Sequence, residues 1–183
     1  MSRPLRILLV NKAYPPHIGG IETLVRQYAR CFQTQFSAEV QVLVCQEKGK
    51  TARETIEGVP VLRAGSIGTY FSCPLSGSFL RYFRKYAKQA DVVMIHMPFP
   101  LADLACLLSG YRGRVVLAWH SDVIKQKTLL RFYAPLLRWL LRRADCILTA
   151  TQGHIDSSAF LPAVQKKCKV IPYGINLAAY RAA

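Results

Sequence analysis

The sequence is poor in acidic residues and has no long apolar run. Ten Asp and Glu residues stand against 25 Lys and Arg residues, giving a formal net charge of +15 over 183 residues. A charge of this size bears on partners rather than on fold, so nucleic acid, anionic lipid and phosphorylated substrates are all candidates. The longest apolar stretches are interrupted by Asp103 and Arg138. None approaches the ~18 residues that a membrane-spanning helix needs.

Paired cysteines and metal motifs are also absent. None of the six cysteines forms a Cys-x-x-Cys pair, and four of them lie inside apolar segments: Cys31, Cys45, Cys106 and Cys146. We expect these four to be reduced core residues rather than disulfides or zinc ligands. No His-Glu-x-x-His motif or Cys/His cluster is present, so we expect neither a metal nor a cofactor. The N-terminal apolar stretch, residues 7–10, is too short for a signal-peptide core, and we expect a cytoplasmic protein.

Apolar runs alternate with amphipathic patterns along the chain. Seven runs are predicted as strands, at residues 5–10, 38–45, 59–64, 91–96, 114–120, 145–150 and 168–174. Helices are predicted at about 21–32, 78–90, 101–110, 128–144 and 152–160, with a kink or restart at Pro135. Continuous apolar strands separated by helices indicate a parallel sheet covered on both faces. We predict an α/β, Rossmann-like, doubly wound fold with a mostly parallel seven-stranded sheet.

Ligands of such sheets bind beyond the carboxyl ends of the strands, so the segments that follow each strand are the candidate site. The first of these segments is "NKAYPPHIGG", in which Gly19 and Gly20 directly precede a helix. Free N–H groups and the positive end of the helix dipole favour a phosphate there. The alternative is a helix cap with a turn that needs positive φ. No G-x-G-x-x-G or P-loop motif is present, so a standard nucleotide fingerprint is excluded.

Three of the four histidines lie at the predicted strand ends. His120 ends the fifth strand, His96 ends the fourth, and His17 lies in the glycine loop. Imidazole can donate to a sugar hydroxyl or a phosphate and titrates near neutrality. The alternative for each is a histidine satisfied by local backbone. Asp122 and Thr151, which follow the fifth and sixth strands, complete the candidate substrate-binding set.

Two predicted helical segments contain basic residues and no acid. The basic residues are Arg81, Arg84, Lys85 and Lys88 in 78–90, and Lys125, Lys127, Arg131, Arg138, Arg142 and Arg143 in 123–144. In the second segment Arg131, Arg138 and Arg142 share one helix face and are the predicted anion-binding residues, and another face holds Leu129, Tyr133, Leu136 and Leu140. Cationic helices of this kind fit an anionic membrane surface, the alternative being a solvated face over a buried stripe. Nucleic acid is disfavoured, since no recognition-helix, zinc-finger or RNP-type motif is present.

The chain resembles family 4 glycosyltransferases, the retaining GT-B enzymes. The resemblance rests on "YPPHIGGIETLVRQYA", "ADVVMIHMPFPLADLA", "AWHSD", "RADCILTAT" and "KVIPYGINLAAY", which follow the family's order and spacing over nearly the whole chain. It implies two Rossmann-like domains facing each other across a cleft. The N-terminal domain mainly binds the acceptor, and the C-terminal domain mainly binds the nucleotide sugar.

The resemblance also implies roles for individual residues. Gly19 and Gly20 match the glycine pair whose amides face the donor diphosphate, and His120 matches the catalytic histidine beside the transferred sugar. Residues 1–174 would form the acceptor-binding domain, and 175–183 would begin the interdomain linker. We expect the donor domain to lie outside these 183 residues, and we therefore expect the chain alone to transfer no sugar.

The implied reaction moves a sugar from a nucleotide sugar to a hydroxyl acceptor with retention and without a metal. The basic segments suggest a lipid-linked acceptor, in polysaccharide or glycolipid assembly, and a peripheral position on the inner face of the cytoplasmic membrane. One alternative is a non-catalytic Rossmann-like module that docks on anionic membranes. Another is an epimerase-like relative, which the histidine–acid turn at 120–122 disfavours.

Overall fold

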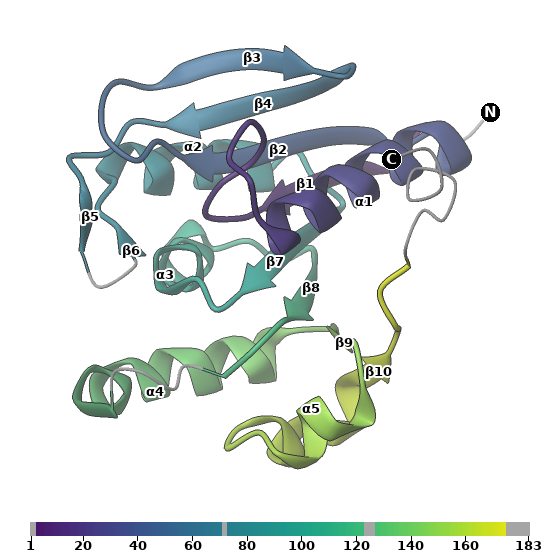
Figure 1. Cartoon of the computed structure of the whole chain (residues 1–183), viewed down its shortest axis with the longest axis vertical. Helices are drawn as coiled ribbons and strands as arrows, with labels where there is room; N and C mark the ends of the chain where they lie inside the picture. The colour runs from purple at the N-terminus through teal and green to yellow at the C-terminus, as the bar shows by residue number, and fades with distance from the viewer. Residues whose placement is uncertain (1–2, 71–72, 123–126, 175–183) are drawn as a thin grey trace.

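The computed structural model describes residues 3–70, 73–122 and 127–174 (Figure 1). Its main sheet has eight strands in the order β10-β9-β8-β7-β1-β2-β4-β3. All neighbouring strands are parallel except β3 and β4. The strands are β1 (Arg6–Val10), β2 (Glu39–Cys45), β3 (Ala52–Ile56), β4 (Val59–Ala64), β7 (Val92–Met97), β8 (Arg114–Trp119), β9 (Cys146–Thr149) and β10 (Cys168–Val170). The predicted doubly wound α/β class is confirmed.

The sheet has one strand more than the seven predicted. The additional strand, β3, pairs antiparallel with β4 through a turn in which Glu57 and Gly58 have φ angles of 51° and 79°. Turns with two positive φ angles match the twist of paired strands. The strand was missed because its sequence, "ARETI", forms no apolar run and its side chains are half-buried or exposed. A short two-stranded hairpin, β5 (Thr69–Tyr70) and β6 (Cys73–Pro74), was also not predicted.

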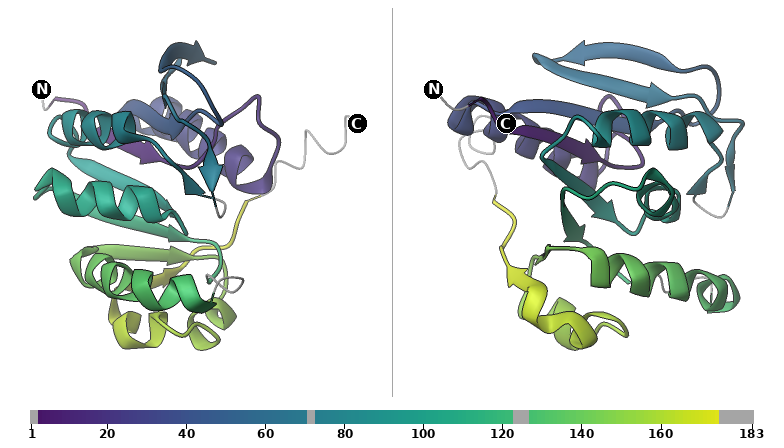
Figure 2. Two further views of the ribbon diagram at one scale, coloured as in Figure 1. Left: turned by 90° about the vertical axis from the view of Figure 1, so that its left-hand side faces the viewer. Right: turned by 180° about the vertical axis from the view of Figure 1, so that it is seen from behind.

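Helices cover both faces of the sheet (Figures 1 and 2). They are α1 (Gly20–Phe36), α2 (Gly77–Ala87), α3 (Pro100–Ser109), α4 (Lys127–Arg143), α5 (Gln152–Asp156) and the 3-10 helix η1 (Leu161–Lys167). Helix α1 packs over one face with Val25 and Ala29, in a core cluster that includes Val42. Helices α2, α3 and α4 pack side by side over the other face, around Phe83 and Leu137.

Several predicted boundaries change. The helix predicted at 21–32 runs to Phe36, and the one predicted at 152–160 ends at Asp156. Helix α4 runs through Pro135 without a restart, although proline removes one helical hydrogen bond. Tyr133, Leu137 and Leu140 are buried on both sides of it, so packing against the sheet holds the helix together. The strand predicted at 168–174 ends at Val170, and the linker predicted at 175–183 lies outside the described residues. Within the described part of the chain, no helix is both long and apolar enough to cross a bilayer.

Candidate functional site

The loop after β1 is fixed by the neighbouring strands. Arg63 of β4 donates hydrogen bonds to the carbonyl oxygens of Tyr14, at 3.1 Å, and of Pro15. The same guanidinium forms an ion pair with Glu54 of β3. Tyr14 is buried beneath the loop. The loop is therefore preorganised by the sheet edge as well as by its own prolines.

Helix α1 begins at this loop with no side-chain cap. Its N-cap residue, Gly19, has φ −175° and ψ 161°, which is ordinary extended backbone. Neither Gly19 nor Gly20 has a left-handed conformation, so a turn requiring positive φ does not explain the glycine pair. A Cβ at Gly20 would meet nothing within 4 Å. The space over Gly20 is open, and the helix N-terminus can receive a hydrogen-bond acceptor there.

The side chain of Glu22 covers Gly19. A Cβ at Gly19 would collide with the Oε2 of Glu22, and His17 Nδ1 lies 3.5 Å from Glu22 Oε1. A carboxylate in the first turn interacts favourably with the helix dipole. It would also repel a diphosphate. An anion at this N-terminus must therefore approach on the Gly20 side or displace Glu22.

Two of the predicted histidines form a hydrogen-bonded chain with a tyrosine. His96, at the end of β7, places Nδ1 3.0 Å from His120 Nε2, and His120 Nδ1 lies 2.6 Å from the hydroxyl of Tyr173. The two imidazole rings stack with centroids 5.2 Å apart. Tyr28 of α1 covers His96, with ring centroids 6.0 Å apart. The helix that starts at Gly20 thus passes over the buried end of this chain.

The surroundings keep both imidazoles neutral at pH 7. Burial lowers the pKa of His96 to about 3, with the neighbouring His120 adding to the effect. Burial, assisted by His154, lowers the pKa of His120 to about 4. If Tyr173 donates to His120, then His120 donates to His96, and the reverse polarity is equally consistent. These hydrogen bonds can therefore relay a proton shift between the hydroxyl of Tyr173 and the buried His96. The Nε2 atom of His96 has no hydrogen-bond partner in the described structure.

Asp122 and Thr151, two other predicted site residues, form structural hydrogen bonds within the protein. Asp122 accepts hydrogen bonds from Trp119 Nε1, at 3.2 Å, and from the amide of Ala159, at 3.0 Å. Thr151 caps α5 by accepting from the amide of His154. Sequence reasoning did not select Tyr173 as a site residue. It follows the last strand at the same sheet edge, so the rule used for the histidines could have found it.

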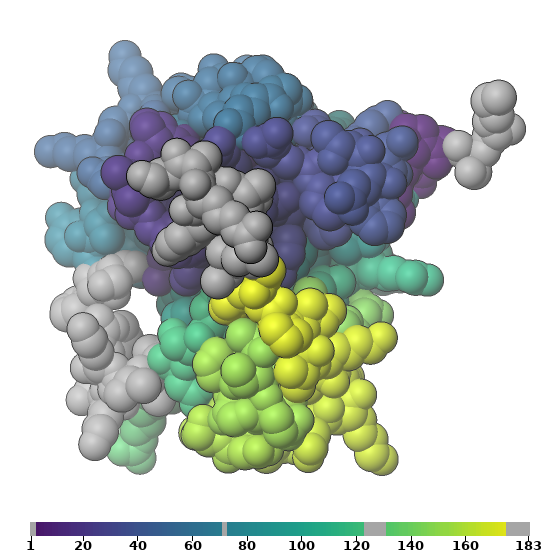
Figure 3. Space-filling view, turned by 45° about the vertical axis from the view of Figure 1, so that its right-hand side comes forward, coloured from purple at the N-terminus to yellow at the C-terminus, as the bar shows by residue number. Residues whose placement is uncertain are grey.

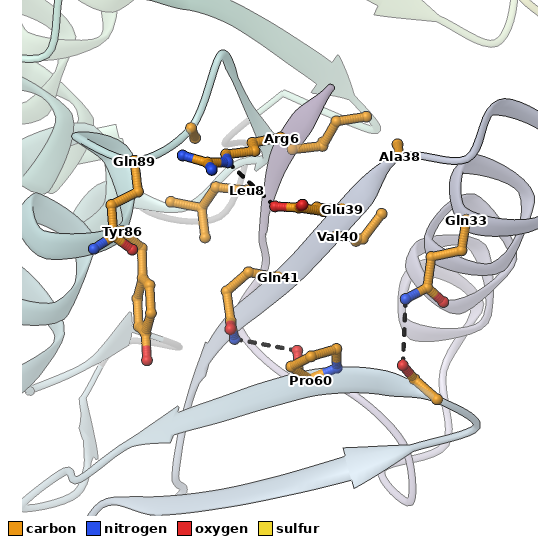
Figure 4. Close-up of a pocket in the computed structure, with 13 residues that line it drawn as sticks. Arg6, Leu8, Gln33, Ala38, Glu39, Val40, Gln41, Pro60, Tyr86 and Gln89 are labelled. Carbon is orange, nitrogen blue, oxygen red and sulfur yellow. Dashed lines mark hydrogen bonds and ion pairs between the residues drawn. The ribbon is translucent and has the colours of Figure 1, made fainter. Parts of the chain in front are cut away.

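Two cavities flank the sheet at opposite ends. One of about 240 Å³ lies beside the glycine loop and is lined by charged groups of both signs, Lys12 and Glu22, and by neutral polar groups such as Thr69. Another, of about 740 Å³, lies around the amino-terminal ends of β1 and β2, where Arg6 and Glu39 form an ion pair (Figure 4). The second cavity is at the far end of the strands from the histidines. Among the described residues, no group of three or more His, Cys, Asp or Glu side chains is placed to hold a metal.

The predicted anion-binding residues do not join this site. They lie on exposed positions of α2 and α4: Arg81, Arg84, Lys85, Lys88, Arg131, Arg138 and Arg142. Figure 3 shows a different face, on which the N-terminal segments in purple and blue lie above the segments around β10 in yellow. The structure thus separates the sheet edge from the basic helices.

Solved structures define the fold class. The chain is similar to sucrose-phosphate synthase (tll1590) from Thermosynechococcus elongatus, with a TM-score of 0.65 and 14% identity over 95% of this chain and 49% of that one. It is also similar to an α,α-trehalose 6-phosphate synthase from Burkholderia multivorans, with a TM-score of 0.54 and 12% identity over 90% and 43% of the two chains. The fold is that of a GT-B glycosyltransferase domain.

Sequence comparison then defines the family. The model described as Glycosyltransferase Family 4 matches residues 18–179. O-antigen chain mannosyltransferase C of Escherichia coli is 31% identical over 174 residues, covering 94% of this chain and 46% of that protein. D-rhamnosyltransferase WbpZ of Pseudomonas aeruginosa is 31% identical over 177 residues, covering 96% and 46%. The chain belongs to glycosyltransferase family 4, and it spans about half the length of the curated relatives it matches.

Proposed function

We propose that this chain is the acceptor-binding half of a retaining glycosyltransferase that moves a sugar from a nucleotide sugar to a hydroxyl. One observation supports this most directly. The uncapped N-terminus of α1 and the chain from His96 through His120 to Tyr173 occur at the same sheet edge. The first offers N–H donors to a diphosphate, and the second offers neutral hydrogen-bonding groups to a sugar.

Catalysis at such a site rests on positioning and on stabilising the leaving diphosphate. The amides at Gly19 and Gly20 would supply donors to that charge. Both ring nitrogens of His120 already have partners, at 3.0 Å and 2.6 Å. A donor-sugar hydroxyl can therefore bind His120 Nδ1 by replacing the half-exposed Tyr173 hydroxyl, while His96 keeps the ring oriented. No metal is assigned a role in this scheme.

The names of the two relatives reduce the range of sugars to propose as the transferred group. One is called a mannosyltransferase of the O-antigen chain and the other a D-rhamnosyltransferase. We therefore assign mannose or its 6-deoxy analogue, rhamnose, as the transferred group, and a growing lipid-linked polysaccharide as the acceptor. The cavity of about 240 Å³ beside the glycine loop, with Lys12 and Glu22 in its wall, supports binding of a hydroxyl-rich acceptor end.

The test is a donor screen on the full-length enzyme with nucleotide-activated mannose, rhamnose and glucose. His120→Ala and Gly20→Val are each expected to lower kcat/KM about 10²–10³-fold, the range seen when one preorganised donor is lost. Gly77→Val is the matched control, because Gly77 also begins a helix and a Cβ there also meets nothing within 4 Å. Equal losses for Gly20→Val and Gly77→Val would reject the diphosphate role. Robust transfer by the 183-residue chain alone would reject its assignment as half of a site.

A second candidate function is docking on anionic membranes, either beside catalysis or in place of it. It is supported by the seven exposed basic residues of α2 and α4, none of which forms an ion pair with a described residue. Binding to vesicles containing phosphatidylglycerol, but not to phosphatidylcholine vesicles, is expected, with loss at high salt. Equal binding to both vesicle types, or none at low salt, would reject this candidate and leave a soluble acceptor.

A further inference from the structure

The solvent-facing side of α3 consists of leucine. Its exposed side chains are Leu104, Leu107 and Leu108, with exposed fractions of 36%, 42% and 58%. They are spaced i, i+3 and i+4, so they form one continuous strip, called here the leucine ridge. The helix has one acid, Asp103, and that side chain is completely buried. Isolated exposed leucines are common on proteins, but a helix face without any polar side chain is not.

Basic helices flank the leucine ridge on both sides. Helix α3 packs between α2 and α4 over the same sheet face, and Figure 2, right, shows the three helices one below another in front of the sheet. Each helix directs its buried residues toward the sheet, so its exposed residues point away from it. The outer surface of this layer therefore has arginine and lysine along α2, leucine along α3, and arginine with Phe132, 78% exposed, along α4.

We infer that α3 inserts the leucine ridge into the acyl boundary of an anionic bilayer while α2 and α4 bind the lipid headgroups. This inference rests on the membrane docking proposed above, and it adds the inserted element and the orientation. An apolar strip between cationic strips is the arrangement by which interfacial helices combine burial with attraction to anionic lipid. The sequences of α2 and α4 contain no acid, so nothing on either flank opposes an anionic surface.

A second copy of the chain fits the leucine ridge less well. Two ridges packed together would bring the arginines of α2 and α4 against those of the partner, and like charges across an interface disfavour association. The net charge of +15 adds to this repulsion. An anionic lipid surface offers apolar burial to the leucine ridge and negative charge to the basic residues on both sides of it.

This docking also orients the sheet edge. The three helices lie over one sheet face, so insertion of the leucine ridge places that face parallel to the bilayer. The strands then run along the membrane, and their carboxyl ends open sideways, just above the headgroups. A lipid-linked acceptor could reach the edge without leaving the bilayer.

Insertion can be measured with a tryptophan placed in the leucine ridge. Leu108→Trp is compared with Phe36→Trp, an exposed position of α1 on the opposite sheet face. With phosphatidylglycerol vesicles, Leu108→Trp is expected to shift its emission to the blue and to be quenched by brominated acyl chains, relative to the wild-type protein. Phe36→Trp is expected to show neither change. In flotation, Leu108→Ser is expected to weaken vesicle partitioning about tenfold, the loss expected when one leucine no longer enters apolar surroundings.

The outcomes separate this inference from the functions on which it rests. Vesicle binding with no quenching at Leu108→Trp would overturn insertion and leave electrostatic docking intact. A blue shift that depends on protein concentration without lipid would identify a second copy as the occupant, and it would overturn the inference. Sugar transfer to a soluble acceptor analogue by the full-length Leu108→Ser variant should equal wild type, so failure of the transferase proposal would appear separately.

Discussion

The two faces of the sheet bury polar groups of opposite kinds. Under α1, the polar pair is the buried His96 and the half-buried His120, bases whose pKa values fall because burial disfavours their charged form. Between α3 and α4, the buried group is Asp103, an acid that accepts a hydrogen bond from the hydroxyl of Tyr133. Burial raises the pKa of Asp103 to about 7. Each face therefore favours an uncharged group, but the two groups respond to pH in opposite directions.

The outer surfaces differ as well. On α1, Arg26 and Arg30 both form ion pairs with Glu57 at the β3–β4 turn. On α2 and α4, the exposed basic residues form no ion pair with a described residue. Among the described residues, the basic side chains of α1 named here are thus compensated within the chain, whereas on α2 and α4 only the half-buried Arg143 is paired, with Asp145. The uncompensated face is the one suited to an external anionic partner.

The largest expected effect is on the free energy of unfolding, when a buried phenylalanine ring on one sheet face and an exposed ring on the other are removed in turn. Phe83→Ala removes a completely buried ring from α2 and should lower the free energy of unfolding by about 3–5 kcal/mol. Phe36→Ala removes a ring that is 67% exposed on α1 and should change it by no more than about 0.5 kcal/mol. Urea unfolding of both variants measures the difference. Similar losses of stability in the two variants would contradict the structure, because they would require the Phe36 ring to be packed and not exposed.

Asp103→Asn should sharpen the contrast in pH response. An acid whose pKa rises on folding contributes stability below its unfolded value, and that stability is lost as the pH rises through about 7. The wild-type protein should therefore lose about 2–4 kcal/mol between pH 4 and pH 8 through this residue. The variant should lack that loss and be the more stable protein at pH 8. Denaturant titrations at both pH values test this, and an equal effect of the substitution at the two would contradict it.

His96→Gln should instead alter how the free energy of unfolding depends on pH below neutrality. A base whose pKa falls on folding contributes stability above its unfolded value near 6.5, and that stability is lost as the pH falls toward about 3. Between pH 7 and pH 5 the wild-type protein should lose about 2 kcal/mol through His96. The variant should lose less over the same interval, as measured by denaturant unfolding. If the variant lost as much stability as the wild type between pH 7 and pH 5, His96 would have to be solvated or charged in the folded protein.

The smallest expected effect concerns the compensated charges. Arg26→Gln breaks the ion pair with Glu57 and should cost about 0.2–1 kcal/mol, less at high salt, because exposed ion pairs contribute little. Arg84→Gln, on α2, should cost nothing measurable, since its side chain is exposed and has no ion-pair partner among the described residues. Thermal unfolding at low and high salt compares the two. A larger cost for Arg84→Gln would reverse the assignment of compensated and uncompensated faces.

Sequence patterns predicted the parallel part of the sheet because its strands are buried on both faces and hence uniformly apolar. They failed at β3, whose polar, largely exposed residues pair only with β4. They also treated Asp103 as a break in an apolar stretch. Its burial depends on Tyr133, 30 residues further along the chain. Contacts of that range leave no trace in local periodicity.

For the candidate site, the sequence likewise predicted the positions of residues but not the contacts between their side chains. The positions of His96 and His120 follow from the rule that ligands meet the carboxyl ends of strands. Their contact with each other, and with Tyr173, depends on side-chain directions that spacing does not define. Asp122 and Thr151 satisfied the same positional rule, yet they form structural hydrogen bonds, Thr151 to the nearby amide of His154 and Asp122 to Trp119 and to the amide of Ala159, 37 residues away. Position after a strand identifies candidates without separating ligand-facing side chains from structural ones.

The contacts of Arg63 have a consequence for engineering. Its guanidinium joins the backbone of the glycine loop to Glu54, so the conformation of residues 14 and 15 depends on a hairpin at the edge of the sheet. A chimera that imports only the loop into a relative would lose those anchors. Transferring the loop together with β4 and β3 would keep those anchors, and substitutions in the outermost hairpin would change the loop conformation from a distance.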